Sequence, residues 1–113
     1  MSDKTIQVRW FIDGPKVSAY LLNPDHPVGG SKAKYLLGFG FSADEPRVLA
    51  EALVDHAMMN APGTVVRQAK GPDRAVFEGT VTAPDGREIP LRTVWEAGKP
   101  YEMRFITAVP LTR

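Results

Sequence analysis

The sequence contains no cysteine and only two histidines, His26 and His56. The absence of cysteine excludes a disulfide framework, a thiolate zinc site and a cysteine nucleophile. Two histidines are too few for a metal site built on several imidazoles, so we expect no metal and no cofactor. Charge of one sign is also lacking, because 14 basic and 13 acidic residues leave a net charge of +1. A uniformly basic surface for nucleic acid is therefore excluded, although a local basic patch is not.

Long hydrophobic runs are absent as well. No uncharged stretch of the sequence approaches the roughly 20 apolar residues that a membrane-spanning helix needs. The first residues, Met1-Ser2-Asp3-Lys4, are polar and show no secretory signal. We therefore expect a cytoplasmic protein without a membrane partner. The 113 residues, 43% hydrophobic and 24% charged, are typical of one globular domain spanning residues 1–113.

Hydrophobic periodicity divides the chain into a helical part followed by strands. A first strand is predicted at residues 5–12, and helices at 15–22, 32–37 and 46 to about 60. Further strands are predicted at residues 64–69, 74–83, 87–96 and 101–109. This order indicates an α+β fold. Two or three N-terminal helices would pack on one face of a twisted antiparallel sheet of four or five strands.

The loop Pro84-Asp85-Gly86 matches a three-residue hairpin, in which a type I turn is followed by a glycine bulge. It places Ala83 opposite Arg87, and the same register then places Glu78 opposite Arg92. Apolar residues face apolar residues across the two strands in this register. A slip of one residue would move them to opposite faces of the sheet.

A five-residue loop before the last strand would set Trp95 opposite Tyr101 and Arg92 opposite Arg104. Glu78, Arg92 and Arg104 would then form a row across three strands, on the face away from the helices. Adjacent guanidinium groups repel each other unless an anion lies between them, and their planar forks match phosphate or carboxylate. The row is therefore either an anion clamp, with Glu78 as orienter or base, or a solvated ladder of ion pairs.

Two further candidates lie before the long helix. His26 stands in a loop stiffened by prolines, and an imidazole suits proton transfer near neutral pH. The alternative is a turn histidine that bonds a local carbonyl. Lys32 follows a glycine pair at a helix start, where exposed backbone N–H groups attract anions. The alternative for Lys32 is an ordinary solvated lysine.

Three more polar residues fall on faces that the pattern predicts to be apolar. His56 lies on the apolar stripe of the long helix, which favours a half-buried histidine satisfied by a backbone group. Thr93 and Thr107 fall on the sheet face that is turned toward the helices, where we expect them to make local hydrogen bonds. Thr107 also lies near the end of its strand, where it could be exposed.

Four segments of the chain form a recognisable pattern. They are Asn23-Pro24-Asp25-His26-Pro27-Val28-Gly29, Ser31-Lys32-Ala33-Lys34, Arg92-Thr93-Val94-Trp95 and Thr107-Ala108-Val109-Pro110. Together they resemble a family of small bacterial toxin-like proteins of uncharacterised function. Members occur as short proteins and as tail domains of larger toxin-like chains, often encoded beside a small antitoxin-like partner. Their order of helices and strands is similar to that of the RelE/barnase/EndoU/colicin group of ribonucleases.

The resemblance implies a metal-independent ribonuclease toxin of a toxin–antitoxin or polymorphic-toxin system. It implies functional roles for His26, Lys32, His56, Arg92, Thr93, Arg104 and Thr107. Glu78 joins them as a second candidate for proton transfer. The expected partners are RNA, either ribosome-bound or tRNA, and a small antitoxin or immunity protein, and a homodimer is compatible. The alternative is a non-catalytic immunity or adaptor module that grips an acidic partner with Arg92 and Arg104.

Overall fold

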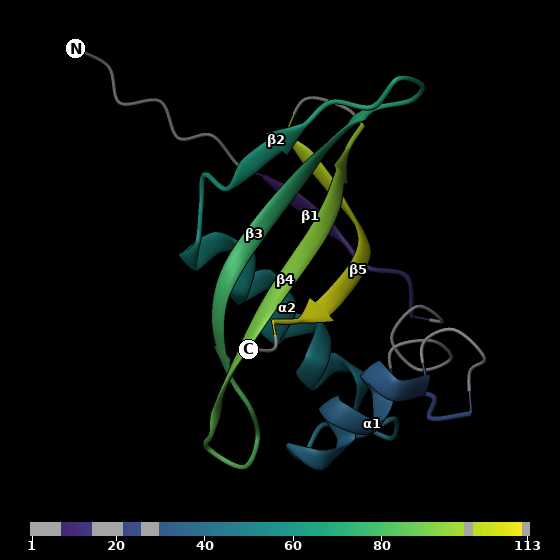
Figure 1. Cartoon of the computed structure of the whole chain (residues 1–113), viewed down its shortest axis with the longest axis vertical. Helices are drawn as coiled ribbons and strands as arrows, with labels where there is room; N and C mark the ends of the chain where they lie inside the picture. The colour runs from purple at the N-terminus through teal and green to yellow at the C-terminus, as the bar shows by residue number, and fades with distance from the viewer. Residues whose placement is uncertain (1–7, 15–21, 26–29, 99–100, 112–113) are drawn as a thin grey trace.

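A computed structural model of the chain describes residues 8–14, 22–25, 30–98 and 101–111. Within these residues, two helices and five strands form the fold, and Figure 1 shows α2 behind the sheet and α1 beside its lower end. The elements are β1 (Arg9–Phe11), α1 (Gly30–Gly38), α2 (Pro46–Met59), β2 (Thr64–Val66), β3 (Asp73–Thr82), β4 (Glu88–Ala97) and β5 (Glu102–Pro110). The order of strands across the sheet is β1-β5-β4-β3-β2.

The predicted α+β class is confirmed, with two differences in detail. The two described helices lie in the middle of the chain, and the sheet is mixed because β1 runs parallel to β5. The predicted helix at residues 15–22 lies outside the described residues except for Leu22, which is buried in the core. Two strands joined by a short hairpin loop must pair antiparallel, whereas β1 and β5 are joined by a long connection and can therefore pair in parallel.

One hydrophobic core fills the space between the helices and the sheet. The helix α2 begins with Pro46, which suits a first turn, and buries a stripe that includes Leu49, Leu53 and Ala57. The sheet contributes alternate residues of its central strands, as expected when one face is covered. They are Ala75, Phe77, Val81, Ile89, Leu91, Trp95, Phe105 and Ala108. We call this covered side the inner face of the sheet and the opposite side the outer face.

The predicted register of the β3–β4 hairpin is confirmed. The backbone N–H of Ala83 donates to the carbonyl of Arg87 at 2.8 Å, and that of Gly86 donates to the carbonyl of Ala83 at 2.9 Å. Gly86 has a φ of 90°, which the glycine position of this turn requires. Glu78 lies directly opposite Arg92, as predicted.

The predicted register of β4 and β5 is wrong. Arg92 lies opposite Val109, and Arg104 lies opposite Glu96. The row of Glu78, Arg92 and Arg104 therefore does not form. The slip is four residues at the Glu96 end of the pair, and an even slip keeps every side chain on its face. On the inner face the observed register pairs Trp95 with Phe105 and Leu91 with Pro110. Apolar residues therefore face each other on that side in both registers, so the pattern could not distinguish them.

A β-bulge between β4 and β5 adds a second correction. Val94 lies opposite Thr107, whereas the next residue, Trp95, lies opposite Phe105, which leaves Ile106 as an extra residue in β5. The extra residue reverses the alternation beyond it. Thr107 therefore shares the outer face with Val94, and the prediction that it faces the helices is wrong.

The described residues contain no helix long and apolar enough to span a membrane.

Candidate functional site

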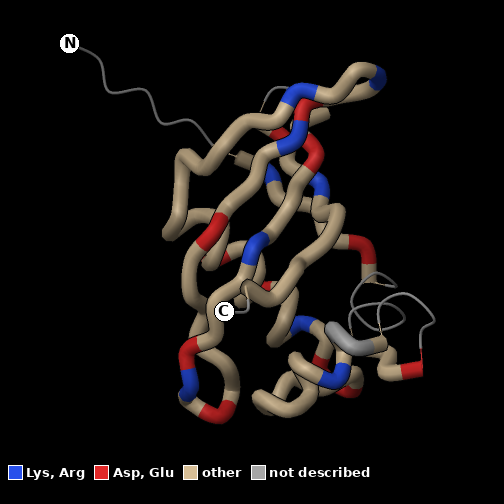
Figure 2. The backbone as a smooth tube through the Cα atoms, viewed as in Figure 1, with Lys and Arg blue, Asp and Glu red and all other residues tan. Residues whose placement is uncertain are grey.

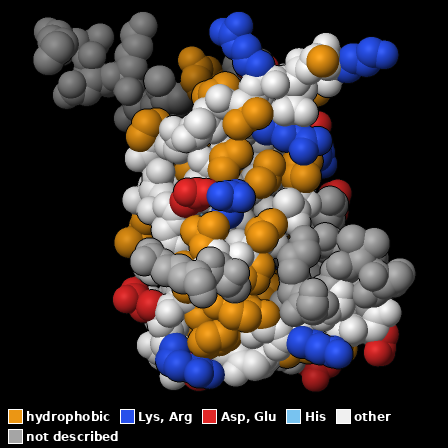
Figure 3. Space-filling view, in the orientation of Figure 1, with side chains coloured by type: hydrophobic (Ala, Val, Ile, Leu, Met, Phe, Trp, Pro, Cys, Tyr) orange, Lys and Arg blue, Asp and Glu red, His pale blue; other side chains and the backbone are white. Residues whose placement is uncertain are grey.

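The outer face of the sheet carries the candidate site, because neither of the two described helices covers it. Its centre mixes charged side chains with apolar ones, and Figure 3 shows an acidic and a basic side chain in contact with hydrophobic side chains around them. By strand register, its residues are Thr64, Val66, Arg74, Val76, Glu78, Arg92, Val94, Glu96, Arg104, Thr107 and Val109.

An ion pair between Glu78 and Arg92 occupies the middle of this face. The Nε of Arg92 donates to Oε2 of Glu78 at 2.5 Å, and the two side chains are 49% and 46% exposed for Glu78 and Arg92. Exposed pairs of this kind contribute at most about 1 kcal/mol to folding. A guanidinium has five N–H donors, so Arg92 can hold Glu78 and still donate to an anion. The pair is therefore better suited to binding than to stabilising the fold.

A hollow of about 530 Å³ lies beside the ion pair, toward the edge strand β2. Its lining combines apolar side chains, a hydroxyl, an amide and the two charges. The lining residues are Asn60, Gly63, Thr64, Val66, Val76, Glu78 and Arg92. A ligand that carries both an anionic and an apolar part would match this combination.

A second charged row crosses the sheet farther along the strands. Arg74 lies opposite Glu96, and Glu96 lies opposite Arg104, so a carboxylate stands between two guanidinium groups. Arg104 also lies 3.8 Å from a carboxylate oxygen of Asp13 and 5.6 Å from the ring centre of Phe11. Figure 2 shows basic and acidic positions gathered at this end of the sheet.

This second row has the composition of the predicted row but not its arrangement, because Glu96 separates the two guanidinium groups that were expected to be adjacent. Arg74 in β3 and Glu96 in β4 stand where Glu78 and Arg92 were predicted, and Arg104 in β5 belongs to the row as expected. The pairing of Arg74 with Glu96 could have been predicted from the sequence, because it follows from the same β3–β4 register that pairs Glu78 with Arg92. Only the partner strand β5 could not be placed.

His56 lies beneath the ion pair, on the inner face, and is 1% exposed. Its Nε2 is 2.9 Å from the carbonyl of Leu91 and 3.1 Å from the carbonyl of Gly79, and its Nδ1 is 3.2 Å from the hydroxyl of Thr93. Since both carbonyls accept, Nε2 carries the proton and donates, and in the neutral ring the hydroxyl of Thr93 donates to Nδ1. The predicted hydrogen bonds of His56 to backbone groups are confirmed, but the residue is fully buried and not half-buried as predicted.

The partners of His56 are the immediate neighbours of the ion pair. Gly79 follows Glu78 in β3, and Leu91 and Thr93 flank Arg92 in β4. The imidazole thus ties together, from the inner face, the two strand segments that present the ion pair on the outer face. Thr93 is itself fully buried, so neither it nor His56 reaches a ligand on the outer face.

The remaining candidates are partly outside the described residues. His26 lies outside them entirely, and Lys32 belongs to α1 with an undescribed side chain. Thr107 lies on the outer face opposite Val94, two residues along the strands from the pair of Arg92 and Val109. The structure therefore brings Glu78 and Arg92 into contact and sets Arg104 apart from them. Within the described ranges, no three metal-ligating side chains gather in one place.

A family model described as "Domain of unknown function (DUF6883)" matches residues 6–112. The chain belongs to this family. The family description itself assigns no activity, so DUF6883 membership establishes kinship and not function. A search of curated proteins gives no match for this DUF6883 member.

Among solved structures, this DUF6883 member is similar to a chain in "Contact-dependent growth inhibition toxin - immunity protein complex from Klebsiella pneumoniae 342". The TM-score is 0.70 at 19% sequence identity, and the alignment covers 90% of this chain and 93% of the other. At this level of identity, the similarity shows a shared fold.

Proposed function

We propose that this chain is the toxin of a bacterial toxin–immunity pair and that it cleaves RNA by metal-independent acid–base chemistry on the outer face of the sheet. The observation that carries the proposal is the fold shared, over 90% of the chain, with a component of a growth-inhibition toxin–immunity complex. The resemblance of the sequence motifs to toxin-like proteins points the same way. The exposed guanidinium groups of the outer face supply contacts for a phosphate backbone.

Cleavage of RNA at a 2′-hydroxyl needs a base, an acid for the departing 5′-oxygen, and cations for the charge on phosphorus. In this proposal, Arg92 holds the scissile phosphate, and Glu78 is the base. Arg104, with Arg74 across Glu96, contacts a second phosphate farther along the strand. The hydroxyl of Thr107 lies between these two rows, where it can contact a ribose.

The other sequence candidates complete the proposal from less direct positions. His26 is the proposed acid, and Lys32 is a proposed contact to a neighbouring phosphate, although the structure describes neither side chain. His56 and Thr93 have a structural role in this proposal, because their hydrogen bonds hold the folded strand segments that carry Glu78 and Arg92.

Expression of the chain in bacteria tests the proposal. Growth arrest and RNA cleavage are expected for the natural sequence, and Arg92→Ala should lower cleavage by about 100-fold or more, the usual cost of removing one donor to a developing charge. The matched control is Arg47→Ala, which removes an exposed arginine of α2 and should leave cleavage unchanged. Absence of cleavage of total RNA, tRNA and ribosomes by the natural chain would contradict the proposal.

A second candidate is a non-catalytic immunity or adaptor module. The observation that favours it is the composition of the outer face, whose described residues include carboxylates and guanidinium groups but no imidazole. In that case the chain binds a protein partner through Arg92 and Arg104, and the affinity falls with salt. A chain that arrests growth when expressed alone excludes this candidate.

A further inference from the structure

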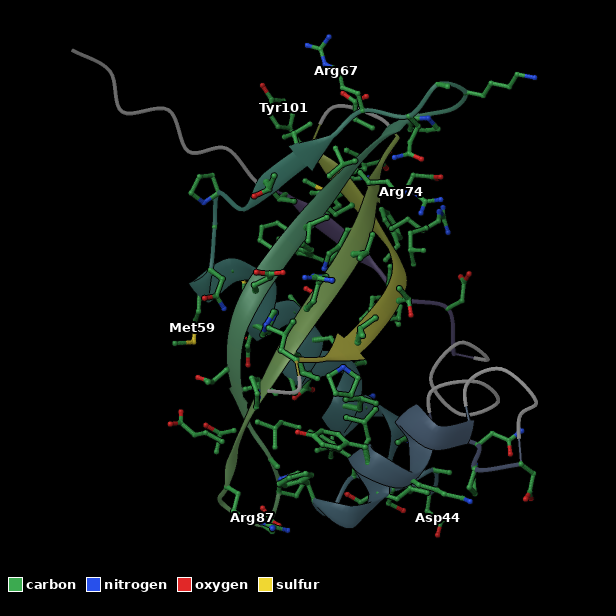
Figure 4. The ribbon with its side chains drawn as sticks, viewed as in Figure 1. Asp44, Met59, Arg67, Arg74, Arg87 and Tyr101 are labelled. Atoms are coloured by element: carbon green, nitrogen blue, oxygen red, sulfur yellow. The ribbon has the colours of Figure 1, made fainter. Side chains whose placement is uncertain are left out.

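Apolar side chains are exposed where α2 ends and β2 begins. Met58 and Met59 close the helix with 52% and 83% exposure, and Val65 and Val66 in β2 are 65% and 42% exposed. Figure 4 shows Met59 projecting outward from the end of α2, below β2. Large apolar side chains gathered in one place on a surface mark sites where another molecule binds.

The strand β2 is also an open edge of the sheet. Among the described residues it pairs with β3 on one side only, and the order β1-β5-β4-β3-β2 leaves its other side without a described strand. Its sequence, Thr64-Val65-Val66, contains no charge and no proline, and all three residues are exposed. Proteins usually protect such edges with lysine, proline or a bulge. This edge has only its short length as protection.

The surroundings of this edge are basic. Between residues 60 and 77 the sequence has three cations, Arg67, Lys70 and Arg74, and one carboxylate, Asp73. Figure 4 shows Arg67 and Arg74 close to the end of β2 and the beginning of β3. A strand that pairs with β2 and extends past Val66 would therefore run alongside these cations.

We infer that the β2 edge binds an extended acidic segment of a partner protein, which adds a sixth strand to the sheet. Main-chain hydrogen bonds to β2 would supply affinity, and alternate side chains would supply specificity. One set of side chains would enter the outer-face hollow lined by Thr64, Val66 and Val76, and the other set would cover Val65. Acidic groups of the segment would meet Arg67 and Arg74.

Charge argues against a second copy of this chain at the same edge. In an antiparallel pair of two β2 strands, the cations that follow Val66 in one copy would lie beside the residues that precede Thr64 in the other. Those residues, Asn60 to Gly63, carry no carboxylate, so a second copy would not match the basic surroundings. The added strand would also border the hollow beside Glu78 and Arg92. A partner bound there would obstruct the outer face. This inference goes beyond the proposed function and does not depend on RNA cleavage.

The test uses the full chain labelled with ¹⁵N and two synthetic nine-residue peptides, one alternating valine with glutamate and the other alternating valine with lysine. NMR titration should shift amide signals centred on residues 64–67, and the glutamate peptide should bind at least tenfold more tightly than the lysine peptide at low salt. Val65→Asp should weaken binding of the glutamate peptide at least tenfold. Val8→Asp, the same change near the opposite edge of the sheet, should leave that binding unchanged.

Four results of the peptide experiment would overturn the inference. They are no binding of the glutamate peptide at millimolar concentration, equal binding of both peptides, shifts centred on β1, and equal effects of the two aspartate variants. Concentration-dependent shifts of residues 64–67 without peptide would assign the edge to a second copy of the chain and would also overturn it. None of these results bears on RNA cleavage, so the proposed function is tested separately.

Discussion

The two faces of the β3–β4 hairpin differ most at one place along the strands. On the inner face, His56 and Thr93 are buried and hydrogen-bonded to each other, and two backbone carbonyls complete the cluster. On the outer face, Glu78 and Arg92 are about half exposed and bonded to each other. A buried polar cluster with satisfied bonds holds a structure, whereas an exposed pair contributes little to it and remains available to a ligand.

The largest expected effect follows from removing the histidine of the inner face. His56→Ala would leave the carbonyls of Gly79 and Leu91 without their donor and open a cavity in the core, so we expect a loss of about 3 kcal/mol in the free energy of unfolding. Urea denaturation measures the loss. Asp55→Ala, at the neighbouring exposed position, should change stability by no more than about 0.5 kcal/mol. Equal effects of the two variants would contradict a structural role for His56.

A smaller effect is expected at Gly79, where the strand and the helix end approach closely. A Cβ added there would collide with Oδ1 of Asn60, and Nδ2 of Asn60 itself donates to the carbonyl of His56 at 2.7 Å. Gly79→Ala must therefore displace Asn60, and we expect a cost of about 1–2 kcal/mol.

A double-mutant cycle sharpens this prediction. If the contact is the cause, Gly79→Ala should cost less in an Asn60→Ala background than in the natural chain, with a coupling of at least about 0.5 kcal/mol. Additive effects of the two substitutions would show that the approach of Asn60 to Gly79 does not limit that position.

The smallest effect concerns a third pair, at the tip of the hairpin. Hydrogen bonds from the side chain and backbone N–H of Arg87, together with its charge, lower the pKa of Asp85 below its ordinary value of 3.8. A lowered pKa in the folded state means that the pair stabilises the fold above pH 3.8 and that this stabilisation is lost as the pH falls through the lowered pKa. Thermal unfolding of the natural chain and Asp85→Asn should therefore differ slightly at neutral pH and converge in acid. A constant difference at every pH would contradict this assignment.

The sequence predicted the sheet correctly where a short loop determines the register. Pro84-Asp85-Gly86 leaves few ways to close a hairpin, so Glu78 and Arg92 could be paired in advance. The connection to β5 contains a residue with positive φ, Tyr101 at 64°. Farther along β5 a bulge lies opposite the step from Val94 to Trp95 in β4. The hydrophobic pattern predicts neither feature. A register slip of an even number of residues keeps each side chain on the same face of the sheet, and a bulge adds only one residue to a strand.

The difference between the two registers also explains which residues of the candidate site could be placed from the sequence. The pairing of Glu78 with Arg92 depends on one hairpin and was predictable, whereas the place of Arg104 depends on a second register and was not. For His56, periodicity correctly gave the apolar stripe of α2. Its partners Thr93 and Gly79 come from strands far away in the sequence, so their arrangement around the imidazole required the structure.

The most direct test of the contrast between the faces uses two neighbouring residues of β4, Arg92 and Thr93. The measurement is the rate of RNA cleavage per folded molecule for Arg92→Ala and Thr93→Val, with the free energy of unfolding determined on the same samples. We predict that Arg92→Ala loses about 100-fold or more in rate with a stability change below about 1 kcal/mol. Thr93→Val should lose about 1–2 kcal/mol in stability and keep most of its rate. The reverse pattern, with cleavage lost on the buried side and retained on the exposed side, would contradict the account.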